Sequence, residues 1–224
     1  MTPPNLPATE NGEKYNQHMP DAKAVSFDLH YHTNIYKQSK DRRRQRLAQH
    51  RHFLQETNVD YVASTEHGYK GPLDAYLYLR DATEGIHTTI LPAVEAISKE
   101  GVDIIFIFRN EDDLRNGLKS LTPFQWSAND CNKIRDAIGA INVIPHPFTP
   151  GKTGFANNMG KQSFIHIQEE VDYIEIHNGL SLHFLENGIR NKKMIAPGGL
   201  KQKVNYTFRL PNDLRNPNTG WAIS

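Results

Sequence analysis

Histidines and carboxylates stand at the ends of several short apolar runs in this chain, and these are the side chains that bind zinc, manganese or iron. Each run has the length of a β-strand and is followed at once by one or more such residues. In chain order, the runs lead into His30 and His32, Glu66 and His67, Glu95, His146, and His177. The carboxyl ends of all strands meet at one rim of a parallel barrel, so we expect these side chains to converge.

The first motif, Asp28-Leu29-His30-Tyr31-His32, is the strongest local signal. Residues i and i+2 of an extended segment point the same way, so His30 and His32 can bind one metal ion. Asp28 lies on the same face and could orient one of these ligands. Two exposed histidines at a strand end would have the same spacing, so the motif alone leaves that alternative open.

The other motifs are weaker individually, and each has a structural alternative. His67 could be a structural histidine, with Glu66 an exposed charge at the rim. Glu95 follows a run too apolar for a loop, so its charge needs a partner, which could be a metal ion or a basic side chain. His146 lies between two prolines, which would aim its imidazole but would equally suit a structural turn.

The segments that must position these residues alternate between strand-like and helical, which is typical of βαβ units and a parallel sheet. We expect helices over residues 41–55, 72–81 and 111–119, one capped by Ser127 that carries Ile134, Ala137 and Ile138, and one capped by Ser181. The glycine-containing stretch 149–161 predicts a long loop directly after His146.

The length favours a single domain, and the balanced charge gives no reason to expect a strongly charged partner. The chain of 224 residues is long enough for one large domain, which we place at residues 24–224 after a flexible, proline-containing leader at 1–23. The 26 Lys and Arg nearly balance the 25 Asp and Glu, so nucleic acid is not expected as a specific partner. No segment approaches the roughly 20 apolar residues that span a bilayer, and Cys131 is the single cysteine. We therefore expect a cytoplasmic protein, and the oligomeric state stays open.

Other cationic residues and histidines are predicted to lie on the surface. The run Arg42-Arg43-Arg44 suits an exposed helix face, with phosphate attraction as the alternative. His50, His52 and His87 are also expected to be exposed.

Together, the motifs resemble the polymerase and histidinol phosphatase (PHP) family. The family's Asp-Leu-His-x-His-Thr, Thr-Asp-His, Gly-x-Glu, His-Pro and Glu-x-x-Asn elements correspond to residues 28–33, 65–67, 93–95, 146–147 and 175–178. The resemblance covers residues 25 to 224 and is most specific at the first and fourth elements. It implies an α/β fold, a distorted (β/α)7 TIM-like barrel, with two or three divalent ions (Zn, Mn or Fe).

The resemblance also implies an activity and a set of site residues. The implied activity is hydrolysis of a small phosphate ester, with metal-activated water as the nucleophile. The implied metal ligands are His30, His32, His67, Glu95 and His146, with Glu95 as the bridge between two ions. By position, Arg109 and Asn178 are candidate substrate-binding residues.

Four departures from the family pattern weaken the prediction of catalysis. The final Asp-x-His is absent, and the chain ends at residues 220–224, where that motif would begin, so we expect the sequence to stop before two ligands and the end of the barrel. Lys37 and Gln38 stand where the family often has Asp or His. Glu66 replaces an aspartate, and Asp103 stands where a ligand histidine often begins a strand.

Two alternative functions follow from these features. An amidohydrolase-like barrel also starts with His-x-His, but it commonly needs a metal-bridging lysine, and no lysine ends a strand between Glu95 and His146. A degenerate, non-catalytic PHP-like binding module fits the missing final motif but does not explain why converging ligands are retained.

Overall fold

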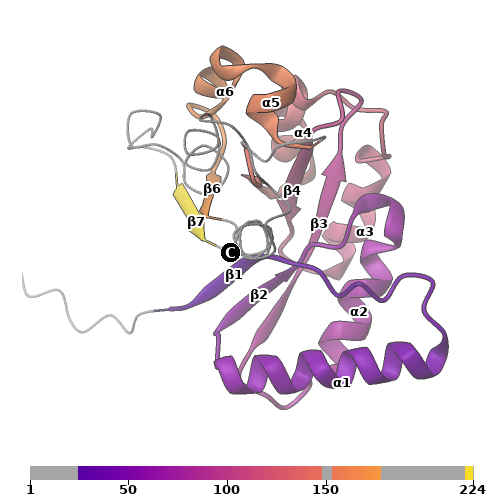
Figure 1. The fold of residues 1–224 in the computed structure, drawn as a ribbon. Coiled ribbons are helices and arrows are strands. Elements are labelled where there is room, and N and C mark those ends of the chain that lie inside the picture. Colours follow the sequence, from indigo (N-terminus) through magenta and orange to yellow (C-terminus); the bar gives the residue numbers. More distant parts are fainter. Residues whose placement is uncertain (1–24, 148–152, 178–219, 224) are drawn as a thin grey trace, which may run out of the picture.

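The computed structural model describes residues 25–147, 153–177 and 220–223 (Figure 1). They form a mixed α/β structure with a curled seven-stranded sheet, in which the strands follow one another in sequence order. The strands are β1 (Phe27–Tyr31), β2 (Tyr61–Ser64), β3 (Thr89–Ile97), β4 (Asp103–Ile107), β5 (Ile141–Ile144), β6 (Tyr173–His177) and β7 (Gly220–Ile223). Strand β7 pairs with β6 and also approaches β1, so the sheet curls towards closure. The predicted leader, residues 1–23, lies outside the described residues.

One strand runs against the others, which corrects the expectation of an all-parallel sheet. β4 is antiparallel to both β3 and β5, whereas the other pairs are parallel. The connection between β3 and β4 is a short turn in which Gly101 takes a left-handed φ of 76°. A parallel crossover needs a dozen or more residues, so this turn can only make a hairpin. The amino end of β4 therefore lies where the carboxyl end of β3 lies, and Asp103 pairs with Ile97.

The helices mostly lie where the sequence predicts them. They are α1 (Lys40–Thr57), α2 (Pro72–Ala82), α3 (Glu111–Ser120), α4 (Cys131–Ile138), α5 (Phe155–Met159) and α6 (Lys161–Ile167), with 3-10 turns η1 (Gly68–Lys70) and η2 (Ala128–Asp130). Helix α4 begins later than expected, because the Ser127 hydroxyl donates to Glu100 instead of capping the helix. The loop prediction over 149–161 is wrong from Phe155 onward, where α5 begins. The helix expected after Ser181 lies outside the described residues.

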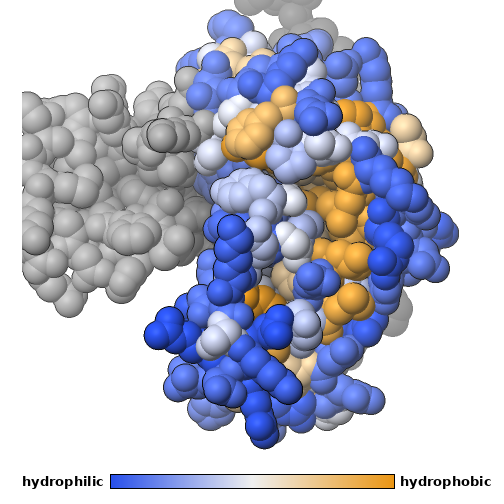
Figure 2. Space-filling view, turned by 90° about the vertical axis from the view of Figure 1, so that its right-hand side faces the viewer, coloured by the Kyte–Doolittle hydropathy of each residue, from blue (hydrophilic) through white to orange (hydrophobic). Residues whose placement is uncertain are grey.

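The hydrophobic core lies between the sheet and the helices that cover it. Strand β4 is buried along its whole length, and Leu79 of α2 and Leu114 of α3 are fully buried beside the sheet. Helix α1 is the exception, because Leu54 is its single buried residue and the rest of it is mostly charged or polar. Figure 2 shows one face of the molecule, where a band of hydrophobic residues lies between strongly hydrophilic ones. None of the helices in the described ranges has the length and hydrophobicity needed to cross a bilayer.

Candidate metal centre

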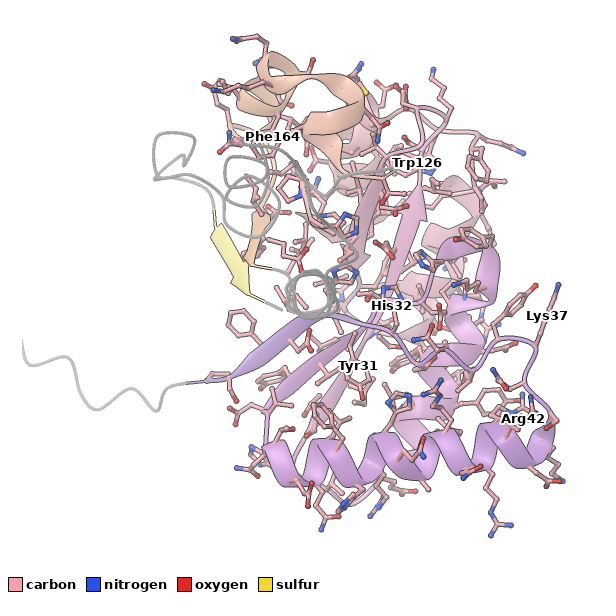
Figure 3. All side chains as sticks on the ribbon, viewed as in Figure 1. Tyr31, His32, Lys37, Arg42, Trp126 and Phe164 are labelled. Carbon is pink, nitrogen blue, oxygen red and sulfur yellow. The ribbon has the colours of Figure 1, made fainter. Side chains whose placement is uncertain are left out.

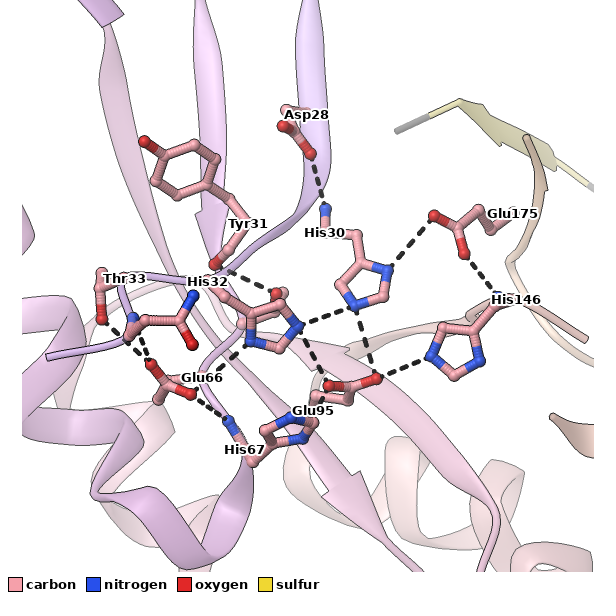
Figure 4. A network of polar contacts seen from close by, with 12 residues as sticks. Asp28, His30, Tyr31, His32, Thr33, Glu66, His67, Glu95, His146 and Glu175 are labelled. Atoms are coloured by element: carbon pink, nitrogen blue, oxygen red, sulfur yellow. Dashed lines mark hydrogen bonds and ion pairs between the residues drawn. The ribbon is translucent and has the colours of Figure 1, made fainter. Parts of the chain in front are cut away.

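The buried carboxylate of Glu95 lies among four imidazoles (Figure 4). Only 1% of the Glu95 side chain is exposed. Its Oε1 lies 3.0 Å from Nε2 of His146 and 3.4 Å from Nε2 of His30. Its Oε2 lies 2.8 Å from Nδ1 of His67 and 3.2 Å from Nε2 of His32. The structure thus brings all five sequence-predicted ligands together.

Different local structures deliver these side chains. His30 lies in β1 and His32 directly after it, so the i, i+2 spacing turns both imidazoles the same way, and their Nε2 atoms lie 3.1 Å apart. His67 precedes the turn η1 and forms an isolated parallel bridge with Glu95. His146 follows β5 with a φ of 30°, a strained conformation of the kind that often occurs at functional sites.

The nitrogen and oxygen atoms of the cluster face one another without forming a closed hydrogen-bond network. Nδ1 of His67 and Oε2 of Glu95 are 2.8 Å apart, yet neither atom makes a hydrogen bond. Oδ1 of Asp103 is also buried without a hydrogen-bond partner. Buried polar atoms in a folded protein are normally paired, so such atoms need an explanation. Convergent imidazole nitrogens and carboxylate oxygens fit a divalent cation, which would accept their lone pairs.

Asp103 joins this cluster because β4 is antiparallel. It forms one of three possible three-ligand groups, together with His67 and Glu95. The other two are His30, His32 and Glu95, and His32, Glu66 and His67, so Glu95 belongs to two of the three groups. The position of Asp103 agrees with the sequence interpretation that it stands in place of a ligand histidine.

Two further carboxylates, Glu175 and Glu66, lie behind the imidazoles. Oε1 of Glu175 lies 3.2 Å from Nδ1 of His30, and Oε2 of Glu175 accepts a short hydrogen bond from the backbone N–H of His146. Oε1 of Glu66 lies 3.7 Å from Nδ1 of His32. Metal-binding histidines typically have such a carboxylate behind them, because it fixes the ring orientation.

The environment of Glu66 excludes the alternative of an exposed rim charge. The side chain is fully buried and accepts hydrogen bonds from the hydroxyl of Thr33 and from the backbone N–H groups of Asn34 and His67. Burial alone would raise the pKa of Glu66, but the nearby imidazole of His32, together with the backbone donors, lowers it to about 2.

The charged groups of the cluster shift one another's pKa values strongly. Burial by itself would lower the pKa of His30, but the charges of Glu175 and Glu95 outweigh it and raise this pKa well above its ordinary value. Burial would raise the pKa of Glu95, but His30 and the other imidazoles hold it well below its usual range. Burial and the charge of Glu95 raise the pKa of Asp103 to about 7. The buried carboxylates therefore depend on positive charge beside them.

Of the two predicted substrate-binding residues, the structure describes Arg109, which is not part of this cluster. Arg109 follows the end of β4, and the reversed direction of this strand carries it away from the rim where Asp103 lies. Its side chain is 83% exposed and forms an ion pair with Asp113. Asn178 lies outside the described residues. Figure 3 shows His32 pointing into the middle of the molecule, whereas Lys37 and Arg42 lie at its periphery.

Sequence reasoning missed the roles of Glu66, Glu175 and His50. Glu175 lies in an apolar run, and the argument applied to the buried charge of Glu95 would have identified it as well. The prediction that His50 lies on the surface is wrong. His50 is partly buried, with Nδ1 2.6 Å from the hydroxyl of Tyr31 and Nε2 2.9 Å from the carbonyl oxygen of Thr33.

Comparison with known proteins gives only remote likenesses. No family model matches the chain, and no curated protein matches it. The solved structures that are similar include the lesion-specific endonuclease PfuEndoQ from Pyrococcus furiosus, at 13% identity and a TM-score of 0.48. Endonuclease Q in complex with a duplex substrate that has an abasic lesion at the active site is also similar, at 15% identity and a TM-score of 0.49. Each match covers 67% of this chain and 41% or 42% of the other chain, so this chain spans about two-fifths of their length. Likenesses this remote assign no function to the chain.

Proposed function

We propose that this protein is a metal-dependent hydrolase of phosphate esters, with a PHP-type barrel whose fourth strand is reversed. The observation that supports the proposal best is the position of Glu95 between two pairs of imidazoles. His30 and His146 lie beside one carboxylate oxygen, and His32 and His67 lie beside the other. A carboxylate with nitrogen ligands beside both oxygens suits a bridge between two metal ions.

The donor set fits zinc, manganese or iron. Imidazole nitrogen and carboxylate oxygen are the ligand types that these ions share in proteins. The three overlapping ligand groups, one of which contains Asp103, would suit two or three ions. When bound, such ions polarise a phosphoryl oxygen and lower the pKa of a bound water towards neutrality.

The residues of this chain would prepare the site for that chemistry. Nδ1 of His30 donates to Glu175, so Nε2 would be the nitrogen of His30 that binds a metal ion. Glu66 lies behind His32, with its Oε1 3.7 Å from Nδ1 of His32. The backbone N–H of His146 is held by Glu175. Glu175 would thus hold His30 and His146 in position before a metal ion binds.

The alternatives fit these contacts less well. An amidohydrolase-type centre would place a lysine between the ions, but the described ion pairs of Glu95 are all with imidazoles. A non-catalytic binding module would not require Glu175 to hold His30 and His146 in position. The exposed Arg109 is not retained as a substrate-binding residue, because it lies away from the cluster.

Phosphate release from an aryl phosphate tests the proposal. Metal-free protein would be assayed after addition of manganese, zinc or iron, beside the variants His32→Ala and His52→Ala. His52 is an exposed histidine of α1 and serves as the matched control. We expect His32→Ala to lose about 100-fold or more in rate, because one strong electrostatic stabiliser is lost, and His52→Ala to behave as wild type.

Two outcomes would contradict this function. Equal rates in all three proteins would reveal a contaminating phosphatase. Absence of hydrolysis with every metal, on phosphate monoesters and on phosphodiesters including DNA, would favour the binding module.

A further inference from the structure

Two exposed aromatic side chains flank the candidate metal centre. Tyr69 is 48% exposed, and its ring stacks on the imidazole of His67, with centroids 5.3 Å apart and planes 10° apart. Phe124 is 57% exposed. His67 lies at the edge of the cluster, in contact with Glu95 (Figure 4). An aromatic ring therefore lies directly against a candidate metal ligand.

The residues before Tyr69 and Phe124 pack together, which brings both residues to the same rim. A β-carbon on Gly68 would lie 3.6 Å from Cγ of Pro123 and 3.8 Å from the carbonyl oxygen of Glu95. The N–H of Phe124 donates to the carbonyl oxygen of Ile97, the last residue of β3. Burial and the charges of Asp103, Glu95 and Glu66 raise the pKa of the Tyr69 hydroxyl, which agrees with a ring close to the carboxylates.

Phe124 has no evident structural reason to be a phenylalanine. Its φ is 64°, in the left-handed region, which Asn and Gly adopt at a lower energetic cost than a bulky residue does. Its ring is mostly exposed, so it adds little to the core. A residue that is strained and also contributes little burial suggests a functional requirement for its side chain.

We propose that Tyr69 and Phe124 are specificity-determining residues that select phosphate esters with a flat aromatic or heteroaromatic ring, as in a nucleotide. This inference rests on the proposed phosphoesterase function and adds a substrate class to it. The phosphate binds at the metal centre, and the ring of the substrate stacks at the aromatic rim. Lys70, with Nζ 5.7 Å from the centroid of the Tyr69 ring, adds a positive charge beside it.

A pair of substrates with and without the base tests this. 2′-Deoxyadenosine 5′-monophosphate and 2-deoxyribose 5-phosphate share the scissile P–O bond at the primary hydroxyl of the same sugar, and the second has a hydroxyl in place of the base. We expect the wild-type protein to prefer the nucleotide in kcat/KM. Loss of base stacking should reduce this preference about 5-fold to 100-fold in Tyr69→Ala and in Phe124→Asn. Tyr69→Phe should keep it, and Tyr61→Ala should change nothing, because Tyr61 is an exposed tyrosine at the start of β2, away from the rim.

Phe124→Asn also separates function from folding, because we expect this variant to be at least as stable as wild type in urea unfolding. Equal kcat/KM for the two substrates in the wild-type protein would overturn the inference even if both are hydrolysed. If neither is hydrolysed, the phosphoesterase function fails. Calorimetric binding of the two compounds in the presence of manganese then tests the ring preference separately from hydrolysis. A Tyr69-dependent preference for the nucleotide supports the inference, and equal binding overturns it.

Discussion

Nδ1 of His30 lies 3.2 Å from Oε1 of Glu175, so a side chain of β1 meets a side chain of β6 although 145 residues separate them. The carboxylate fixes the tautomer of His30 and leaves Nε2 free to bind a metal ion. The same carboxylate accepts a hydrogen bond from the backbone of His146. One residue thus orients two ligands that lie far apart in the sequence.

We predict that Glu175→Gln weakens metal binding about 10-fold to 100-fold, because the amide holds His30 less firmly and is a poorer acceptor. Titration of metal-free protein with zinc against a competing chelator measures the change. Glu56→Gln, at an exposed position of α1, is the control and should bind as wild type. Equal affinity of Glu175→Gln and wild type would mean that Glu175 does not support a metal ligand.

The ligand residues could be predicted because their signal is local. His30 and His32 are two residues apart in an extended segment. A charged residue directly after an apolar run, as at Glu95, predicts a buried charge that needs a partner. The helix boundaries follow from equally local features, and Pro72 begins α2 as its fixed φ favours.

The direction of β4 could not be predicted in the same way, because a parallel and an antiparallel strand have similar compositions. The short connection around Gly101 does indicate the direction, because a parallel crossover needs a dozen or more residues. That reversal puts Asp103, and not Arg109, at the rim where the metal centre lies. The role of Glu66 depends on its burial by residues 33 and 34, which are distant in sequence and which no periodicity reveals.

We predict that metal binding raises the thermal stability of the protein. The buried carboxylates Glu95 and Asp103 gain a cation that the unfolded chain cannot hold in place. At a free metal concentration about 100 times the dissociation constant, the gain is about 2.7 kcal/mol, which corresponds to a rise in Tm of roughly 5 to 10 °C for a chain of this size. Calorimetric scans with and without zinc or manganese measure it. Glu95→Ala should show little of this rise, and an equal rise in that variant would place the metal elsewhere.

We predict that His50 makes the stability of the metal-free protein depend on pH. Nε2 of His50 donates to the carbonyl oxygen of Thr33, so the neutral ring accepts the Tyr31 hydroxyl at Nδ1. Burial lowers the pKa of His50 below its ordinary value. The unfolded chain therefore takes up this proton first as the pH falls. The stability contributed by neutral His50 is present above about pH 6.5 and is lost progressively below it.

His50→Gln keeps a donor and an acceptor but cannot titrate. Urea unfolding of the metal-free proteins at pH 7.5 and pH 5 should show wild type losing stability relative to this variant at the lower pH. His52→Gln, at an exposed position, should show no such difference. Parallel pH profiles for wild type and His50→Gln would contradict the inferred protonation state.

We predict that Asp103→Asn stabilises the metal-free protein at pH 8 while it reduces metal binding. The Asp103 side chain is buried beside Glu95, and its Oδ1 makes no hydrogen bond, so its negative charge opposes folding when no cation is present. Burial and the charge of Glu95 raise its pKa to about 7, so the carboxylate is ionised at pH 8 in the folded state as well. Removal of this charge should increase the free energy of unfolding by about 1 to 3 kcal/mol, and the number of metal ions bound should fall. Urea unfolding at pH 8 and elemental analysis after dialysis measure the two effects. A variant that is less stable without metal would show that Asp103 is held by structural hydrogen bonds, and one that is more stable yet binds as much metal would exclude Asp103 as a ligand.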